Sequence, residues 1–123
     1  MGLFRNPGLV CLIALVAVSC STTQSRYVML GESYPPRPES YEVEVFQGDQ
    51  PTRPYVKISR LDVHMEKTHF ISSSLNTALP LLKQQARLSG ADAIIDIREL
   101  HSSTAETKIY HVIATGIRYT DAK

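Results

Sequence analysis

The stretch Leu79–Leu100, LPLLKQQARLSGADAIIDIREL, places a helix signal, a glycine and a strand signal in direct succession. At about 100° per residue, the apolar side chains of this stretch and of the turn before it fall on one helix face. They are Leu75, Leu79, Leu82 and Ala86, and the side chains that fall on the other face are Lys83, Gln84 and Arg87. The sequence therefore predicts one amphipathic helix whose apolar face packs on a core.

The ends of this helix are also marked. Pro80 has no backbone N–H, so we expect it in the first turn, with the N-cap at Asn76 or Thr77. Gly90 can adopt the left-handed conformation that closes a helix. Residues 92–100 then alternate, with Ala93, Ile95 and Ile97 on one side, which predicts a half-buried strand.

Two strands are predicted before the helix. Tyr41–Gln47 alternates apolar and acidic residues, and Tyr55–Met65 begins with Val56 and Ile58 facing inward. The apolar residues of the second strand then change parity, so we expect a bulge near Ser59 or Arg60.

One further strand follows, at Lys108–Tyr119, the longest of the predicted strands. It is apolar on both faces, as a central strand is, and its small residues Ala114 and Gly116 leave room for a helix lying across them. The order strand, strand, helix, strand, strand predicts an α+β domain in which one amphipathic helix packs on a small, mostly antiparallel sheet of about four strands.

The N-terminus has the features of an export signal. Residues 1–19 contain one charge, Arg5, and an apolar run, Leu9–Val18, about half as long as a membrane span. The run ends in Ala17-Val18-Ser19-Cys20, which resembles a bacterial lipobox, so we expect Cys20 to be lipidated and to become the first mature residue. An ordinary signal-peptidase site, which Ala-x-Ser also fits, and an uncleaved anchor are the alternatives.

Residues 20–40 are polar, Ser/Thr-rich at first and Pro-rich later, and are interpreted as a tether for a domain at 41–123. An edge strand at Tyr27–Leu30 and a Pro-rich ligand for a groove are the alternatives. The residue after Cys20 is Ser21. In many Gram-negative lipoproteins, an Asp at this position retains the protein in the inner membrane. We therefore expect a lipid-anchored protein of the cell envelope, on the outer membrane and facing the periplasm.

Cysteine and charge exclude several classes of function. Cys11 leaves with the signal peptide and Cys20 carries lipid, so no thiol remains for a disulfide, a thiolate metal site or a nucleophile. The net charge of +1 gives no reason to expect nucleic acid as a partner.

Few residues suggest chemistry. His64 and His69, with Glu66 between them, are weak metal candidates, because no cysteine joins them and the spacing matches no zinc pattern. The carboxylates have no evident partner for acid–base work. We expect no enzyme activity and no cofactor.

The phrase ALPLLKQQARLSGADAII, between PYVKISRLDV and VIATGIRY, resembles the YbjQ/RcsF-like superfamily over Tyr41–Tyr119. The resemblance implies a small α+β domain. RcsF-like members are outer-membrane lipoproteins that sense envelope damage, and YbjQ-like members are oligomeric proteins.

These observations lead to two functional hypotheses. The first is a non-catalytic envelope lipoprotein, held on the membrane through the lipid on Cys20, that binds another envelope protein as a sensor, adaptor or assembly factor and that could form oligomers. The alternative is a membrane-displayed module that binds a small ligand or a metal.

Overall fold

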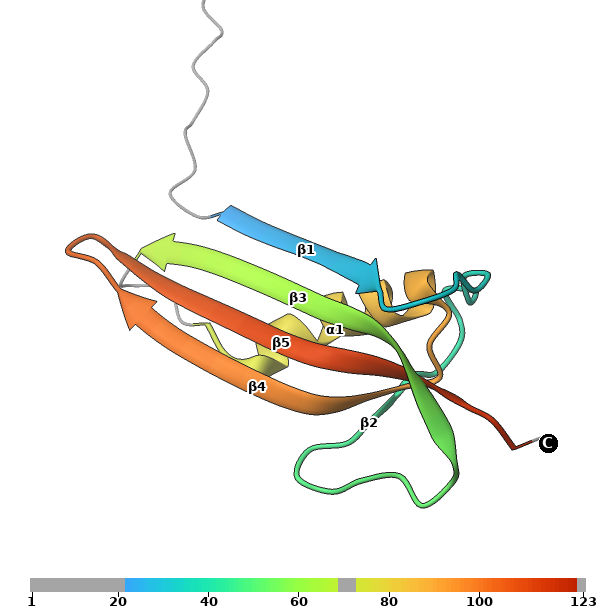
Figure 1. The fold of residues 1–123 in the computed structure, drawn as a ribbon. Helices are drawn as coiled ribbons and strands as arrows, with labels where there is room; N and C mark the ends of the chain where they lie inside the picture. Colours follow the sequence, from blue (N-terminus) through green and yellow to red (C-terminus); the bar gives the residue numbers. More distant parts are fainter. Residues whose placement is uncertain (1–21, 69–72, 122–123) are drawn as a thin grey trace, which may run out of the picture.

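The computed structural model describes residues 22–68 and 73–121. Its elements are β1 (Thr22–Met29), β2 (Glu44–Val45), β3 (Tyr55–Thr68), α1 (Leu75–Ser89), β4 (Ala93–Ser103) and β5 (Thr107–Tyr119). The predicted α+β class is confirmed: a single helix packs on one face of a single sheet (Figure 1).

The sheet has five strands in the order β1-β3-β5-β4-β2, one strand more than expected. All neighbours are antiparallel except β2 and β4, which are parallel, so the sheet is mixed. β5 lies at the centre, as predicted. Its residues Tyr110, Val112 and Ala114 are buried beneath α1, and an added Cβ at Gly116 would clash with Ser59 Oγ.

Of the predicted apolar face of α1, Leu82 and Ala86 are fully buried and Leu75 and Leu79 pack against the core, whereas Gln84 on the predicted outer face is exposed. The C-terminus is also as predicted. Gly90 has φ 87°, and its N–H donates to Arg87 O.

The predicted start of the helix is wrong. Ser74 is the N-cap, the N–H groups of Thr77 and Ala78 donate to Ser74 O, and Pro80 lies inside the helix. The earlier start brings Leu75 onto the core, and we attribute the tolerance of an interior proline to this extra burial.

The strand β3 contains the expected irregularity. Its register with β5 shifts between Lys57 and Ser59, so Ile58 and Leu61 are both buried despite their opposite parity. Val56 was predicted to face inward with Ile58, but its side chain is 43% exposed, so that prediction is wrong.

The predicted alternation of β4 is wrong at Asp96. This residue has φ 53°, and the register with β5 shifts between Ile95 and Arg98. Ala93 and Ile95 pack with Ile117 in a small second cluster, whereas Ile97 packs against the main core. The bulge reverses the direction in which the following side chains point, so Ile97 does not share a face with Ala93 and Ile95.

The predicted tether is part of the folded domain. Thr22–Met29 forms β1 along the edge of β3, and Met29 packs against the core. The Pro-rich segment lies against the end of α1, where the Arg37 N–H donates to Arg87 O at 2.7 Å. The edge-strand alternative for Tyr27–Leu30 was therefore closer, and the boundary at Tyr41 is wrong.

The strand predicted at Tyr41–Gln47 is reduced to the two residues of β2. Its pairing with β4 is parallel, and Glu44 lies opposite Ala93. Only this short segment reaches the edge of β4, so the rest of the predicted strand forms the connections on either side.

Candidate functional site

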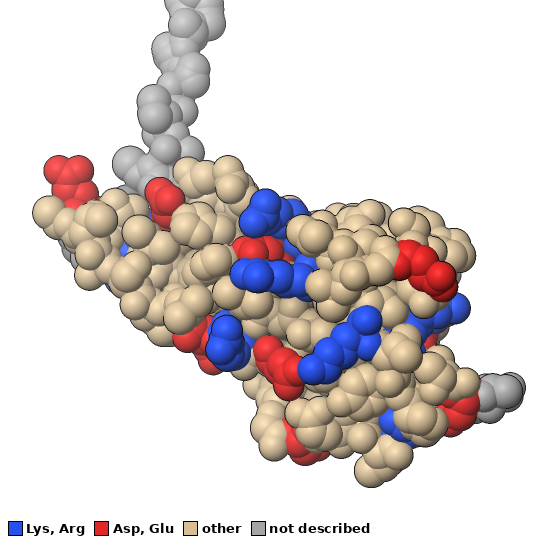
Figure 2. Space-filling model, viewed as in Figure 1, with Lys and Arg blue, Asp and Glu red and all other residues tan. Residues whose placement is uncertain are grey.

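The face of the sheet that α1 leaves uncovered carries the densest group of polar side chains. We call it the open face, and it points toward the viewer in Figures 1 and 2. Alternation along the paired strands places on it Arg26 and Val28 of β1, Arg60, Asp62, His64 and Glu66 of β3, Ile109, His111 and Ile113 of β5, and Arg98 and Leu100 of β4. Figure 2 shows basic side chains across the middle of this face, with acidic ones among them.

At the centre of the open face lies a largely buried carboxylate. The Asp62 side chain is 10% exposed, and its Oδ1 accepts a hydrogen bond from His111 Nε2 at 2.5 Å. The guanidinium groups of Arg26 and Arg60 lie 3.9 Å from Oδ2. Because both arginines are well exposed, their ion pairs are weak, and His111 is the main partner of Asp62.

A second histidine completes this group. His64 is the cross-strand partner of His111, the ring centroids are 5.4 Å apart, and His64 Nε2 bonds Glu66 Oε2 at 2.9 Å. Sequence spacing could not reveal that His64 and His111 are neighbours, because it does not give the register of β3 with β5.

The weak metal hypothesis gains little from this arrangement. His64 lies on the open face, but His69 falls outside the described residues. Within the described part of the chain, no group of three or more His, Cys, Asp or Glu residues could hold a metal ion. The structure therefore brings together two imidazoles and two carboxylates, but the described residues do not place them as the ligands of one metal ion.

A different carboxylate, Asp92, joins the Pro-rich segment to the end of β5. Its Oδ1 accepts hydrogen bonds from Arg37 at 2.5 Å and from the Tyr41 hydroxyl at 2.6 Å, and its Oδ2 accepts the Tyr119 N–H at 2.8 Å. Burial, reinforced by the bond to Asp92, raises the pKa of Tyr41. These bonds fasten the Pro-rich segment to the end of β5, so the role of Asp92 is structural.

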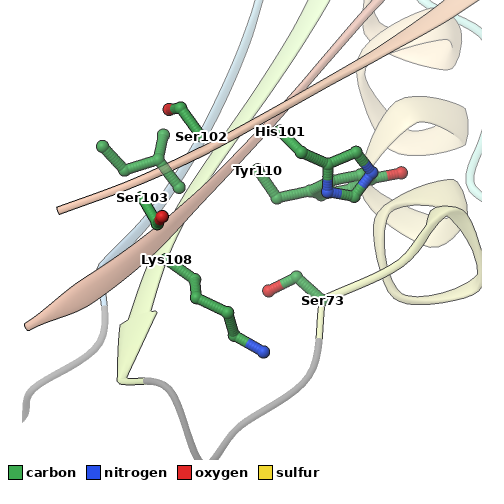
Figure 3. Close-up of a pocket in the computed structure, with 7 residues that line it drawn as sticks. Ser73, His101, Ser102, Ser103, Lys108 and Tyr110 are labelled. Carbon is green, nitrogen blue, oxygen red and sulfur yellow. The ribbon is translucent and has the colours of Figure 1, made fainter.

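A pocket of about 350 Å³ lies where β4 and β5 turn toward each other (Figure 3). It is lined by Ser73, His101, Ser102, Ser103, Lys108, Ile109 and Tyr110. The Tyr110 hydroxyl donates to Glu99 Oε1 at 2.7 Å, and burial together with this bond raises the pKa of Tyr110. Ser73 Oγ is buried and has no hydrogen-bond partner among the described residues.

The described residues form a small α+β domain with one helix on a five-stranded mixed sheet. Comparison with family models, with curated proteins and with solved structures finds no match. Among the residues that the structure describes, no helix has the length and apolar character required to cross a membrane.

Proposed function

We propose that this chain is a non-catalytic lipoprotein of the cell envelope, anchored through lipid on Cys20, on the outer membrane and facing the periplasm, that binds another envelope protein through its open face. The Ala17-Val18-Ser19-Cys20 sequence supports the anchor. The resemblance to the YbjQ/RcsF-like superfamily supports the same proposal.

The observation that carries the protein-binding role is the mixed chemistry of the open face. Ile109 and Ile113 are half-buried, Leu100 is 51% exposed and Val28 is 49% exposed. These apolar side chains lie among the arginines described above. Protein interfaces combine apolar contact area with arginine in this way, and arginine is among the residues enriched at them.

Site-specific photocrosslinking in intact cells tests this role. A photoreactive amino acid at Ile113 should give a discrete adduct with a second protein, and the same amino acid at Gln84, on the outer face of α1, should not. Adducts of equal yield at both positions, or none at Ile113, would contradict the assignment of the open face.

The anchor is tested separately by mass spectrometry of the mature N-terminus. A diacylglyceryl modification should be found on Cys20, and a Cys20→Ser protein should leave the membrane fraction. One acyl chain binds a membrane only marginally, and firm attachment needs more than one. If Cys20 carries the several acyl chains of a lipoprotein, the protein should not wash off the membrane easily.

The metal-binding alternative has one observation in its favour, the contact between His64 and His111. Each Nε2 is bonded to a carboxylate, an arrangement that orients histidine ligands at many metal sites. It remains the second candidate function, because a pair of imidazoles is a small ligand set for a divalent cation.

A further inference from the structure

The start of β1 lies very close to the proposed lipid anchor. Only Ser21 separates Cys20 from Thr22, the first residue of β1. Since an extended chain spans at most about 3.6 Å per residue, the two Cα atoms can be no more than about 7 Å apart. If Cys20 carries lipid, as the proposed function requires, this end of the sheet is held at the membrane surface without a spacer.

The pocket between β4 and β5 lies at that same end. Thr22 pairs with Glu66, Glu66 pairs with Ile109, and Ile109 pairs with Ser102, so one row across four strands joins the start of β1 to the pocket wall. Figure 1 shows that the β4–β5 hairpin and the start of β1 lie at the same end of the sheet, with the end of β3 between them.

One lysine, Lys108, lines the pocket, and a second, Lys67, lies beside it on β3. Lys67 and Lys108 are direct cross-strand partners, an arrangement in which like charges repel. No ion pair joins either ammonium group to a carboxylate among the described residues. A bound anion would relieve this repulsion.

Two further features suit an anion. Figure 3 shows the Lys108 ammonium group and the Ser73 hydroxyl pointing toward the same space, with His101 beside it. Ser73 Oγ is the buried hydroxyl without a partner in the described structure. Ser73 also precedes α1, whose first turn has no acidic residue, so the positive end of the helix dipole is left uncompensated there.

We propose that this pocket binds the phosphate of a membrane-lipid headgroup, with Lys108 and the Ser73 hydroxyl as its ligands and with Lys67 adding positive charge from the neighbouring strand. A phosphate offers several acceptor oxygens to donors of this kind. A free phosphate would suit the same donors, but the short link to Cys20 keeps the pocket among headgroups. The lipoprotein would then be held by its acyl chains and, in a fixed orientation, by a second lipid.

The orientation can be measured on the complete lipidated protein in vesicles that contain phosphatidylglycerol. The lipid blocks the thiol of Cys20, so a fluorophore can be attached to Ala105→Cys at the hairpin or to Thr120→Cys at the far end of β5. These positions are roughly 40 to 50 Å apart along β5. A spin-labelled headgroup should quench the fluorophore at residue 105 and leave the fluorophore at residue 120 bright.

Two variants test the cause of this orientation. Lys108→Gln should lower the ratio of docked to undocked protein roughly fivefold, the effect of one basic residue at an anionic surface, and Lys83→Gln on α1 should not. A Gly-Ser linker of about ten residues after Ser21, about 17 Å in mean extension, should weaken the quenching while the protein stays on the vesicles.

The outcomes separate this inference from the proposed function. An unmodified Cys20 would refute the lipid anchor itself. A lipidated protein with equal quenching at residues 105 and 120, or with equal effects of Lys108→Gln and Lys83→Gln, would refute the headgroup site alone. Loss of quenching on addition of inorganic phosphate would identify free phosphate as the ligand and overturn the lipid assignment.

Discussion

The packing of the Pro-rich segment on the end of α1 can be tested at Gly90. This residue has φ 87°, and an added Cβ would lie 2.8 Å from both Pro35 O and Tyr34 Cβ. Gly48 is the matched control, because it has φ 89° and nothing within 4 Å of its added Cβ. Replacing either glycine by alanine forces a side chain into the left-handed region, at about 1 to 2 kcal/mol. Only Gly90→Ala also creates a clash.

The clash involves backbone and a Cβ atom, neither of which can rotate away. Overpacking of this kind costs about 1 to 3 kcal/mol, so Gly48→Ala should cost about 1 to 2 kcal/mol and Gly90→Ala about 2 to 5 kcal/mol. The loss of unfolded-state entropy on replacing glycine is common to both variants, so the difference between them isolates the contact.

Urea unfolding of the chain from Ser21 to Lys123, followed by circular dichroism, gives both free energies of unfolding. The two variants should have the same m-value, so that the midpoints report stability. Equal losses for Gly90→Ala and Gly48→Ala would refute the close contact of Tyr34 and Pro35 with the helix end. The segment would then be a tether after all.

Three further predictions concern packing in the core, the loss of stability at alkaline pH and the effect of removing metal. Leu82→Ala should cost about 2 to 5 kcal/mol because Leu82 is fully buried, whereas Gln84→Ala should change little; equal losses in urea would mean that the helix face is wrong. Burial raises the pKa of Tyr110, so the folded state keeps the phenolic proton that the unfolded state loses above about pH 10, and stability should fall as the pH rises further. Tyr110→Phe should cost about 1 kcal/mol at pH 7 through the lost bond to Glu99 and should show a smaller alkaline loss; an unchanged loss in urea melts at pH 7 and 11 would contradict this. Thermal melts with and without chelator should coincide, because no group of three or more His, Cys, Asp or Glu residues in the described part of the chain could hold a metal ion, and a fall of several degrees with chelator would support the metal hypothesis.

Sequence patterns predicted the elements whose burial is one-sided. The stripe through Leu82 gave the helix face, and the parity change after Ile58 gave the bulge of β3, because in both places the core selects side chains at a fixed period. Gly90 marked the helix end for a conformational reason that does not depend on the rest of the fold.

The strand β1 had no such signal. As an edge strand it is exposed along most of its length, and only Ser25 and Met29 are half-buried. Its polar composition is therefore also compatible with a tether. Only the pairing with β3 shows that this segment is a strand. The bulge at Asp96 was hidden for a related reason: a non-glycine residue in the left-handed region has no distinctive neighbours in the sequence.

The candidate surfaces were the least predictable part. The bond between His111 and Asp62, and the pairing of Lys67 with Lys108, both arise from the register of β3 with β5. Periodicity gives the face on which a residue lies but not its neighbour on the next strand. The strand order β1-β3-β5-β4-β2, which only the structure shows, identifies these neighbours.

The pairing of β3 with β5 also determines how this domain acquires its structure. Tyr55 pairs with Tyr119, and the whole of α1 and β4 lies between them in the chain, whereas β4 and β5 are joined by a short turn. Loop closure therefore favours early formation of the β4–β5 hairpin, with β3 joining later and β1 after it. Refolding should thus be slower than in helical domains of this size, and a newly synthesised chain would expose the unpaired edge of β5 until β3 closes on it.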